Sequence, residues 1–387
     1  MDRPGKSRLT RAVASVAAGL APAVVALAVS LVVTQRHGLG AWGTVARVQV
    51  AAQVFALVAA HGVKELLVTS AAKFPSEAGS VWRILAKRHL GYALVAGLVS
   101  TVLFGFSIVG LLTGAWVVLL VSRELLEALV IRRSAFGRAA IGETAAAIVV
   151  VAGVVNATGS QTLDRADLVA VLLAGAAVRV IWLASLSWET RGELNSVATR
   201  PGGASFAVLS LAGFVQSRGD AIIAAAVLNN ASLGTYFIAL NAVQTGRAII
   251  AFGLRPHAPA LHRLSAQSVK KLATTQAQRW GIFALVLSIA VPIAIASWWD
   301  GDARWWWSPL LLLSLAPMAW RYPWTQWLLG RGDEQYVARA TVAVAAVVLL
   351  VSWPALVAFG AVGGLAVAAG SELAMSSWTA RRVMVHQ

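Results

Sequence analysis

A succession of apolar runs, each about as long as a membrane is thick, is the feature that most constrains this chain. A helix that spans a bilayer needs about 20 mostly apolar residues and satisfies its own backbone hydrogen bonds. Twelve runs meet that length, at about 12–33, 42–63, 91–110, 114–131, 140–157, 166–187, 204–227, 235–253, 280–298, 305–328, 338–359 and 361–379. The sequence therefore predicts an all-α polytopic membrane protein.

The composition supports this class and excludes several functions. The chain is 58% hydrophobic and 12% charged, and it contains no cysteine, which excludes disulfides, thiolate metal sites and cysteine nucleophiles. The net charge of +16 is dispersed between apolar runs rather than gathered in a basic domain, so we expect no nucleic-acid partner. A glycine-rich loop ending in Lys-Ser or Lys-Thr is absent, so we expect no ATP hydrolysis. We also expect no cofactor.

The basic residues are distributed unevenly between the two sets of connecting loops. The loops 64–90 and 254–279 carry five Lys or Arg each. Loops on the other side carry only Arg36, Arg165 and Arg304, and six Arg lie well within runs. This leaves 23 of the 32 basic residues on the first side, with Arg339, at the edge of its run, counted there. Because cytoplasmic loops are enriched in Lys and Arg, both termini are predicted to lie in the cytoplasm, with the chain in the cytoplasmic membrane.

Five tryptophans flank the short outer loop that contains Asp300 and Asp302. They are Trp298, Trp299, Trp305, Trp306 and Trp307. Tryptophan is enriched at membrane interfaces, so we expect these residues to form an outer aromatic belt.

A weak internal repeat relates the two halves of the chain. LGAWGTVARVQVAAQVFALVAAHGV begins at Leu39 and LGTYFIALNAVQTGRAIIAFGLRPH begins at Leu233, and each has an aromatic residue, Trp42 or Tyr236, two residues after its glycine. An offset of six spans gives both halves the same orientation in the membrane. We therefore expect two parallel six-helix lobes, 1–196 and 197–387, around a central cavity.

Two charges interrupt the apolar run LAGFVQSRGDAIIAAAVL, which extends from Leu211 to Leu228. On a helix, Asp220 falls on the same face as Ser217 and Gly213, whereas Arg218 points away from that face. Charge at membrane depth is costly and usually faces a bundle interior, a partner or water. Asp220 therefore either lines a cavity or belongs to a structural ion pair.

These segments resemble the polysaccharide flippase family of the MOP (multidrug/oligosaccharidyl-lipid/polysaccharide) exporter superfamily. The resemblance is carried by the LGAWG loop before a polar second span and by SRGDAIIAAAVLNNASLGTYFIALNAV, in which Asp220 and Leu233-Gly234-Thr235-Tyr236 match the family pattern. It implies translocation of a polyprenyl-pyrophosphate-linked oligosaccharide by alternating access, for cell-surface polysaccharide synthesis. The implied partners are this lipid-linked oligosaccharide, the bilayer and other membrane proteins of polysaccharide assembly.

Polar residues within the spans are the candidates for binding such a substrate. The planar fork of Arg donates paired hydrogen bonds to phosphate oxygens, so Arg at membrane depth suits a pyrophosphate. The candidate substrate residues are Arg47, Gln53, Arg218, Asn241, Gln244, Arg247 and Arg321, and the candidate ion-coupling residues are Asp220, Glu124 and Glu127, with Glu143 and Glu372 as further proton carriers.

Several of these side chains have simpler interpretations. Arg47 and Arg179 lie within reach of an interface by snorkelling, and Arg123 can pair with Glu127 at i, i+4. Trp320, Trp324 and Trp327 on the tenth run either stack on sugars or pack against a neighbouring helix. Gly360 and Gly364 form a small-xxx-small pair that predicts a close helix contact.

Other functions remain open at this point. A peptidoglycan-precursor flippase carries a pyrophosphate-linked substrate and needs the same cationic cavity. A multidrug exporter of the same superfamily fits less well, since its substrates are mostly cations. A membrane glycosyltransferase or polymerase needs a sizeable outer loop, which this chain lacks, so we do not expect an enzyme.

Overall fold

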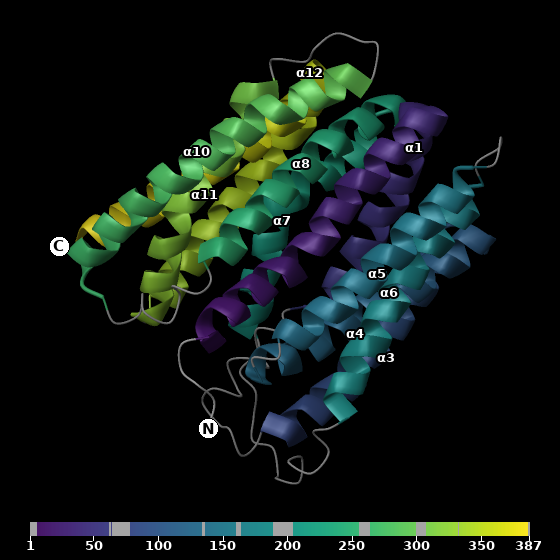
Figure 1. Cartoon of the computed structure of the whole chain (residues 1–387), viewed down its shortest axis with the longest axis horizontal. Coiled ribbons are helices and arrows are strands. Elements are labelled where there is room, and N and C mark those ends of the chain that lie inside the picture. The colour runs from purple at the N-terminus through teal and green to yellow at the C-terminus, as the bar shows by residue number, and fades with distance from the viewer. Residues whose placement is uncertain are drawn as a thin grey trace. The chain divides into compact units, whose positions relative to one another are not determined.

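The computed structural model describes residues 6–61, 63, 78–133, 136–159, 164–188, 204–254, 264–298, 307–331 and 333–385, and they are almost wholly helical. The helices in chain order are α1 (Lys6–Ala60), α3 (Ala78–Leu103), α4 (Ile108–Arg133), α5 (Phe136–Ala157), α6 (Arg165–Trp188), α7 (Ala204–Val227), α8 (Asn230–Leu254), α10 (Ala266–Trp298), α11 (Trp307–Gly330) and α12 (Glu334–Val385) (Figure 1). The predicted all-α membrane class is confirmed.

The two longest helices are each broken at a glycine. Gly38 in α1 has φ 83° and ψ 167°, and Gly360 in α12 has φ 58° and ψ −136°. These angles are sterically open to glycine and strained for residues with a Cβ. Each long helix therefore consists of two consecutive segments, which correspond to the paired runs 12–33 with 42–63 and 338–359 with 361–379.

Six helical stretches among the described residues are long and apolar enough to cross a bilayer. They are Ala23–Ala60, Ile108–Glu127, Arg138–Ala157, Arg165–Leu186, Ala266–Ile293 and Glu334–Val385. Helices α7, α8 and α11 contain the Arg, Asn and Gln residues that lower mean hydropathy. The number of membrane crossings, twelve, stays a prediction.

The boundary between the third and fourth runs was predicted in the wrong place. Helix α3 ends at Leu103 and α4 begins at Ile108, whereas the runs were placed at 91–110 and 114–131. The chain turns through Gly105 (φ 76°) and Phe106 (φ 51°). Hydropathy gave no signal there because the turn is itself apolar. Helices α3 and α10 also begin well before their apolar runs, since the preceding basic segments continue as helix.

The chain folds as two compact units. The first comprises Met1–Val25 and Thr44–Leu211, and the second comprises Ala26–Gly43 and Ala212–Gln387. In the first unit, α3 packs on α4, α4 on α6 and α5 on α6. In the second, α10 and α12 pack on α11, which also contacts α8. The predicted lobes, 1–196 and 197–387, stay a prediction.

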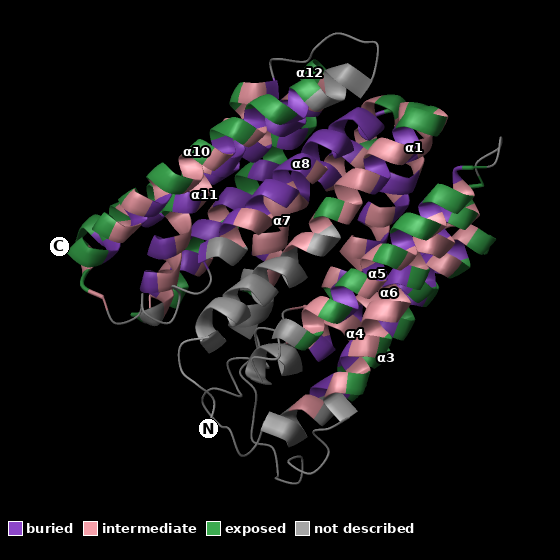
Figure 2. Cartoon of the chain, in the orientation of Figure 1, coloured by how far each residue is buried: buried purple, intermediate pink, exposed green. Residues whose placement is uncertain are grey.

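Large apolar side chains are exposed on the outside of both units, as a protein solvated by lipid requires. Figure 2 shows exposed and intermediate residues on the outer helices and many buried residues along α8. Leu98 on α3 keeps 62% of its area exposed and Leu350 on α12 keeps 76%, whereas Glu372 on α12 keeps only 1%. Apolar residues thus face outward and charged residues inward in the spans.

The Leu-Gly motifs that define the repeat lie against each other in the second unit. A Cβ on Gly234 would overlap the carbonyl oxygen of Leu39, and a Cβ on Gly43 would overlap the carbonyl oxygen of Asn230. Only glycine permits this approach of α1 to the start of α8. The corresponding segments of the two repeats therefore meet at backbone contact.

The predicted aromatic belt falls mostly outside the described side chains. Nothing is described for the side chains of Trp298, Trp299, Trp305 and Trp306. Trp307 is 1% exposed, so it packs against protein rather than at an interface.

Candidate functional site

Asp220 and Tyr236 form the first element of a buried polar site in the second unit. Tyr236 Oη donates a hydrogen bond to Asp220 Oδ2 at 2.5 Å, and the two residues are 0% and 1% exposed. The tyrosine ring lies on Gly364, where a Cβ would stand 2.6 Å from Tyr236 Cε2. One side chain thereby joins α7, α8 and α12.

Gly360 and Gly364 have different roles from the predicted shared contact. A Cβ on Gly360 would have no neighbour within 4 Å, and this glycine forms the break in α12, whereas a Cβ on Gly364 would overlap the ring of Tyr236. The small-xxx-small prediction was therefore wrong for Gly360 and right in kind for Gly364.

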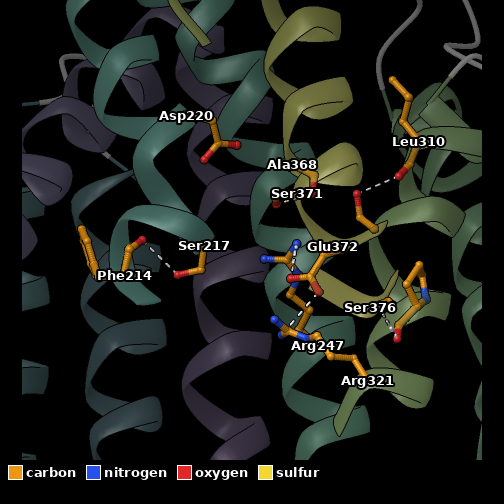
Figure 3. A network of polar contacts seen from close by, with 12 residues as sticks. Phe214, Ser217, Asp220, Arg247, Leu310, Arg321, Ala368, Ser371, Glu372 and Ser376 are labelled. Carbon is orange, nitrogen blue, oxygen red and sulfur yellow. Dashed lines mark hydrogen bonds and ion pairs between the residues drawn. The ribbon is translucent and has the colours of Figure 1, made fainter. Parts of the chain in front are cut away.

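Glu372 is the centre of the second element, a buried triad of one carboxylate and two guanidinium groups. Its Oε1 lies 3.1 Å from Arg247 Nη2, and its Oε2 lies 3.3 Å from Arg321 Nη2. Both arginines point toward the carboxylate, from α8 and α11 (Figure 3). The exposed fractions are 1% for Glu372, 8% for Arg247 and 18% for Arg321. The triad carries a net charge of +1.

The triad is held by charge more than by aligned hydrogen bonds. Among the described residues, Arg247 Nε and Nη2 and Glu372 Oε2 are buried without a hydrogen-bond partner of acceptable geometry. Unsatisfied buried donors each cost about 1–3 kcal/mol. A ligand with several acceptor oxygens would satisfy them.

The Asp220–Tyr236 element and the Glu372 triad interact electrostatically. Asp220 interacts with both Arg218 and Arg247 through Coulomb attraction. Arg218, Arg247 and Arg321 carry three positive charges, whereas Asp220 and Glu372 carry two negative charges. An excess positive charge therefore remains at membrane depth in this unit.

The contacts also fix the relative direction of α8 and the second segment of α12. Tyr236 contacts Gly364, and further toward the C-terminal end of both helices Arg247 contacts Glu372. Tyr236 and Arg247 are eleven residues, or about three turns, apart and so share one face of α8. The two segments run parallel, with one face of α8 supplying both contacts.

A separate set of charges lies in the first unit. Arg123 Nε lies 2.5 Å from Glu127 Oε1 within α4, which is the predicted i, i+4 pair. Arg179 Nε on α6 lies 2.6 Å from Glu143 Oε2 on α5. Arg179 was expected to snorkel to an interface. The structure instead gives it an acidic partner on the neighbouring helix α5, which offsets part of the cost of keeping the guanidinium away from water.

The remaining candidates are divided between the units. Arg47 and Gln53 are half-buried in the first unit, whereas Asn241 and Gln244 are half-buried on α8 in the second. Asn241 Nδ2 lies 3.5 Å from the carbonyl oxygen of Ala26, at the long limit of a hydrogen bond. Their roles in substrate binding stay predictions.

The tryptophan stripe on α11 packs against protein along most of its length. Trp324 and Trp327 are 6% and 2% exposed and belong to an apolar cluster with Val269, Leu328 and Val383. Trp327 also donates its indole hydrogen bond to the carbonyl oxygen of Leu264 at 2.9 Å. Trp320 is 44% exposed, so it alone of the three is available to a ligand or to lipid.

Sequence reasoning named Glu372 only as a proton carrier and missed its pairing with Arg247 and Arg321. It also missed the bond from Tyr236 to Asp220, although both residues belong to the motif. One signal was available: a lone glutamate in the apolar second half of α12 requires cationic partners on other spans. No sequence signal specifies which spans those are.

No protein-family model matches the chain, and no curated protein matches it in sequence. Solved structures match over nearly its whole length. The chain resembles the lipid II flippase MurJ in an inward closed conformation with a TM-score of 0.70 and 11% identity, covering 96% of this chain and 87% of that one. It resembles an inward-facing multidrug resistance MATE transporter of the MOP superfamily with a TM-score of 0.56 and 11% identity, covering 97% and 95%.

A third structure is a MOP superfamily transporter from Pyrococcus furiosus described by a binding pocket of reversed polarity. Its TM-score is 0.55 at 11% identity, over 100% of this chain and 97% of that one. All three are transporters rather than enzymes. The chain therefore has the fold of MOP superfamily transporters.

Proposed function

We propose that the protein is a flippase that moves a polyprenyl-pyrophosphate-linked oligosaccharide across the cytoplasmic membrane by alternating access. The observation that carries this proposal is the excess of arginine at membrane depth in the second unit, where Arg247 and Arg321 share the single carboxylate of Glu372. A cargo with two negative phosphates balances that excess, and guanidinium groups bind phosphate through paired hydrogen bonds.

The fold and the charge together favour this function over multidrug export. MATE transporters share the fold, but a site with surplus arginine repels cationic drugs. The lack of ATP-binding sequence implies that transport is driven by an ion gradient, a partner or the substrate gradient. We assign the coupling role to Asp220, Glu124 and Glu127, of which Glu127 is paired with Arg123.

A second candidate cargo is the lipid-linked peptidoglycan precursor. The similarity to the lipid II flippase MurJ, at a TM-score of 0.70, favours it. Both cargoes contain a polyprenyl pyrophosphate, so the arginine site suits either one. The sugars distinguish them, and the exposed Trp320 is a candidate contact for sugar rings.

The test is translocation in reconstituted vesicles. Two fluorescent substrates are compared, an undecaprenyl-pyrophosphate oligosaccharide and lipid II, with a zwitterionic lipid as the reference. We expect protein-dependent movement of the oligosaccharide. Movement of lipid II alone would assign the second cargo, and movement of neither would contradict a flippase of pyrophosphate-linked lipids.

Two arginine variants locate the site. Because two arginines share one carboxylate, Arg247→Gln or Arg321→Gln leaves a neutral ion pair, so the protein should still fold. Translocation should fall at least tenfold, and Lys should restore it only in part because it lacks the planar fork. Arg382→Gln is the matched control, since Arg382 pairs with Asp333 outside the site, at 2.8 Å. Full transport by both site variants would remove these residues from the binding site.

A further inference from the structure

Glu372 lies between the two arginines to which the proposed function assigns the substrate phosphate. Its two carboxylate oxygens each face one guanidinium, at 3.1 Å from Arg247 and 3.3 Å from Arg321. A phosphate oxygen that binds between these two Nη2 atoms would compete with the carboxylate for the same donors. The structure thus places an internal anion between two buried guanidinium groups.

The geometry of the triad makes the carboxylate displaceable. Arg247 Nε and Nη2 and Glu372 Oε2 are buried without aligned hydrogen bonds among the described residues. Arginine makes charge-assisted bonds to a carboxylate and to a phosphate alike, but a pyrophosphate has more acceptor oxygens and more negative charge than a carboxylate. A multivalent phosphate therefore competes effectively where a monovalent anion does not.

The side chains of the triad are exposed to different degrees. Arg321 retains 18% of its side-chain area exposed, whereas Glu372 retains 1%. Arg321 is therefore the more accessible of the two arginines, since Arg247 retains only 8%. Glu372, Arg247 and Arg321 belong to α12, α8 and α11, so exchanging the anion changes the link among three helices of one unit.

We infer that Glu372 is a resident counter-anion, which the pyrophosphate of the cargo displaces from Arg247 and Arg321 during binding. This inference rests on the proposed function and adds a specificity device to it. When the site is empty, Glu372 neutralises part of the arginine charge and holds α12 to α8 and α11. A cargo must carry enough negative charge to replace it, which excludes neutral and monoanionic lipids.

The test measures binding of inorganic pyrophosphate to the full-length protein in detergent, for wild type and Glu372→Gln. We expect Glu372→Gln to bind pyrophosphate about tenfold more tightly, because the competing carboxylate is gone. The same order should hold for polyprenyl pyrophosphate, and orthophosphate should show a smaller gain. If Glu372 had a purely structural role, its substitution would lower the affinity for pyrophosphate or leave it unchanged.

A second variant keeps the negative charge at position 372, so that a folding defect caused by loss of that charge can be recognised. Glu372→Asp is one methylene shorter and cannot hold both arginines, so its affinity should fall between those of wild type and Glu372→Gln. Asp333→Asn, which removes the carboxylate partner of Arg382 away from the triad, is the control and should bind as wild type does. Equal affinities in wild type, Glu372→Gln and Glu372→Asp would overturn the inference.

The transport assay separates this inference from the proposed function. If wild type translocates the lipid-linked oligosaccharide and Glu372→Gln has wild-type affinity, only the counter-anion role fails. If wild type translocates no pyrophosphate-linked lipid, the proposed function fails whatever the affinities are. If the proposed function and the counter-anion role both hold, Glu372→Gln should bind pyrophosphate more tightly than wild type does. It should nevertheless translocate the oligosaccharide more slowly, because the carboxylate that displaces the cargo at release is missing.

Discussion

Tyr236 on α8 donates a hydrogen bond to Asp220 on α7 at 2.5 Å while its ring rests on Gly364 of α12. The bond gives the buried carboxylate a donor, and the ring contact fixes where that donor lies. Both residues come from the motif that suggested a flippase. The motif therefore has a structural role, which is to join three helices of one unit, besides any role in transport.

The first prediction separates these two roles. Tyr236→Phe removes the hydroxyl and leaves Asp220 Oδ2 without this donor, at a cost of about 1–3 kcal/mol in stability. Asp220→Asn keeps a side-chain oxygen as acceptor for Tyr236, so we expect it to fold normally. Thermal unfolding in detergent is measured beside transport in vesicles. If Asp220 couples ion movement, Asp220→Asn loses transport at normal stability.

The opposite result would be equally informative. An Asp220→Asn protein that unfolds at a much lower temperature would make Asp220 the structural partner of Arg218 and Arg247 and would contradict coupling. Normal stability together with normal transport would show that its charge serves neither purpose.

The second prediction concerns the close approach of α12 to α8. Gly364→Ala places a methyl group 2.6 Å from Tyr236 Cε2, so the ring or the helix must shift, at a cost of about 1–3 kcal/mol. Gly370→Ala is the matched control on the same helix, because a Cβ there meets nothing within 4 Å. The control should be neutral or slightly stabilising, by up to about 1 kcal/mol. Equal unfolding temperatures for the two variants would show that α12 does not pack closely against the ring of Tyr236.

How much of this arrangement could be predicted differs between the spans and the site. The apolar runs identified the helices because hydropathy over 20 residues is a local property of the chain. The breaks at Gly38 and Gly360 fall where gaps between runs were expected. The turn at Gly105 and Phe106 was missed because phenylalanine keeps the local hydropathy high.

The site was predictable in its residue types but not in its pairings. Asp220, Arg247 and Arg321 stood out because charge in an apolar run is costly and needs a reason. Their partners depend on which helices pack together, and that depends on contacts between distant parts of the chain. Glu372 and Arg179 show the difference: each had an evident charge, and each has a partner on another helix.

The third prediction tests the ion pair between Arg179 and Glu143 in the first unit. Glu143→Gln leaves Arg179 buried without its carboxylate, which should lower stability by about 3–5 kcal/mol. The double variant Glu143→Leu with Arg179→Met removes both charges and should recover most of that loss. Unfolding temperatures of the single and double variants decide the question. A double variant as unstable as the single one would mean that the pair is not an isolated unit and that Arg123 and Glu127 depend on it.

The last prediction concerns the orientation of the chain in the membrane. The excess of Lys and Arg in 64–90 and 254–279 predicts that reporter fusions after residues 75, 265 and 385 lie in the cytoplasm, and that fusions after 160 and 302 lie outside. Residues 75, 160 and 302 are outside the described part of the chain.

The structure adds one requirement that does not depend on the positive-inside rule. Helix α8 and the second segment of α12 run parallel, since Tyr236 meets Gly364 and Arg247 meets Glu372 in the same chain order. The fusions after 265 and 385, which follow these two segments, must therefore report the same side. Agreement on the outer side would reverse the orientation and leave the fold intact. Disagreement between them would contradict the parallel contact and the triad that depends on it.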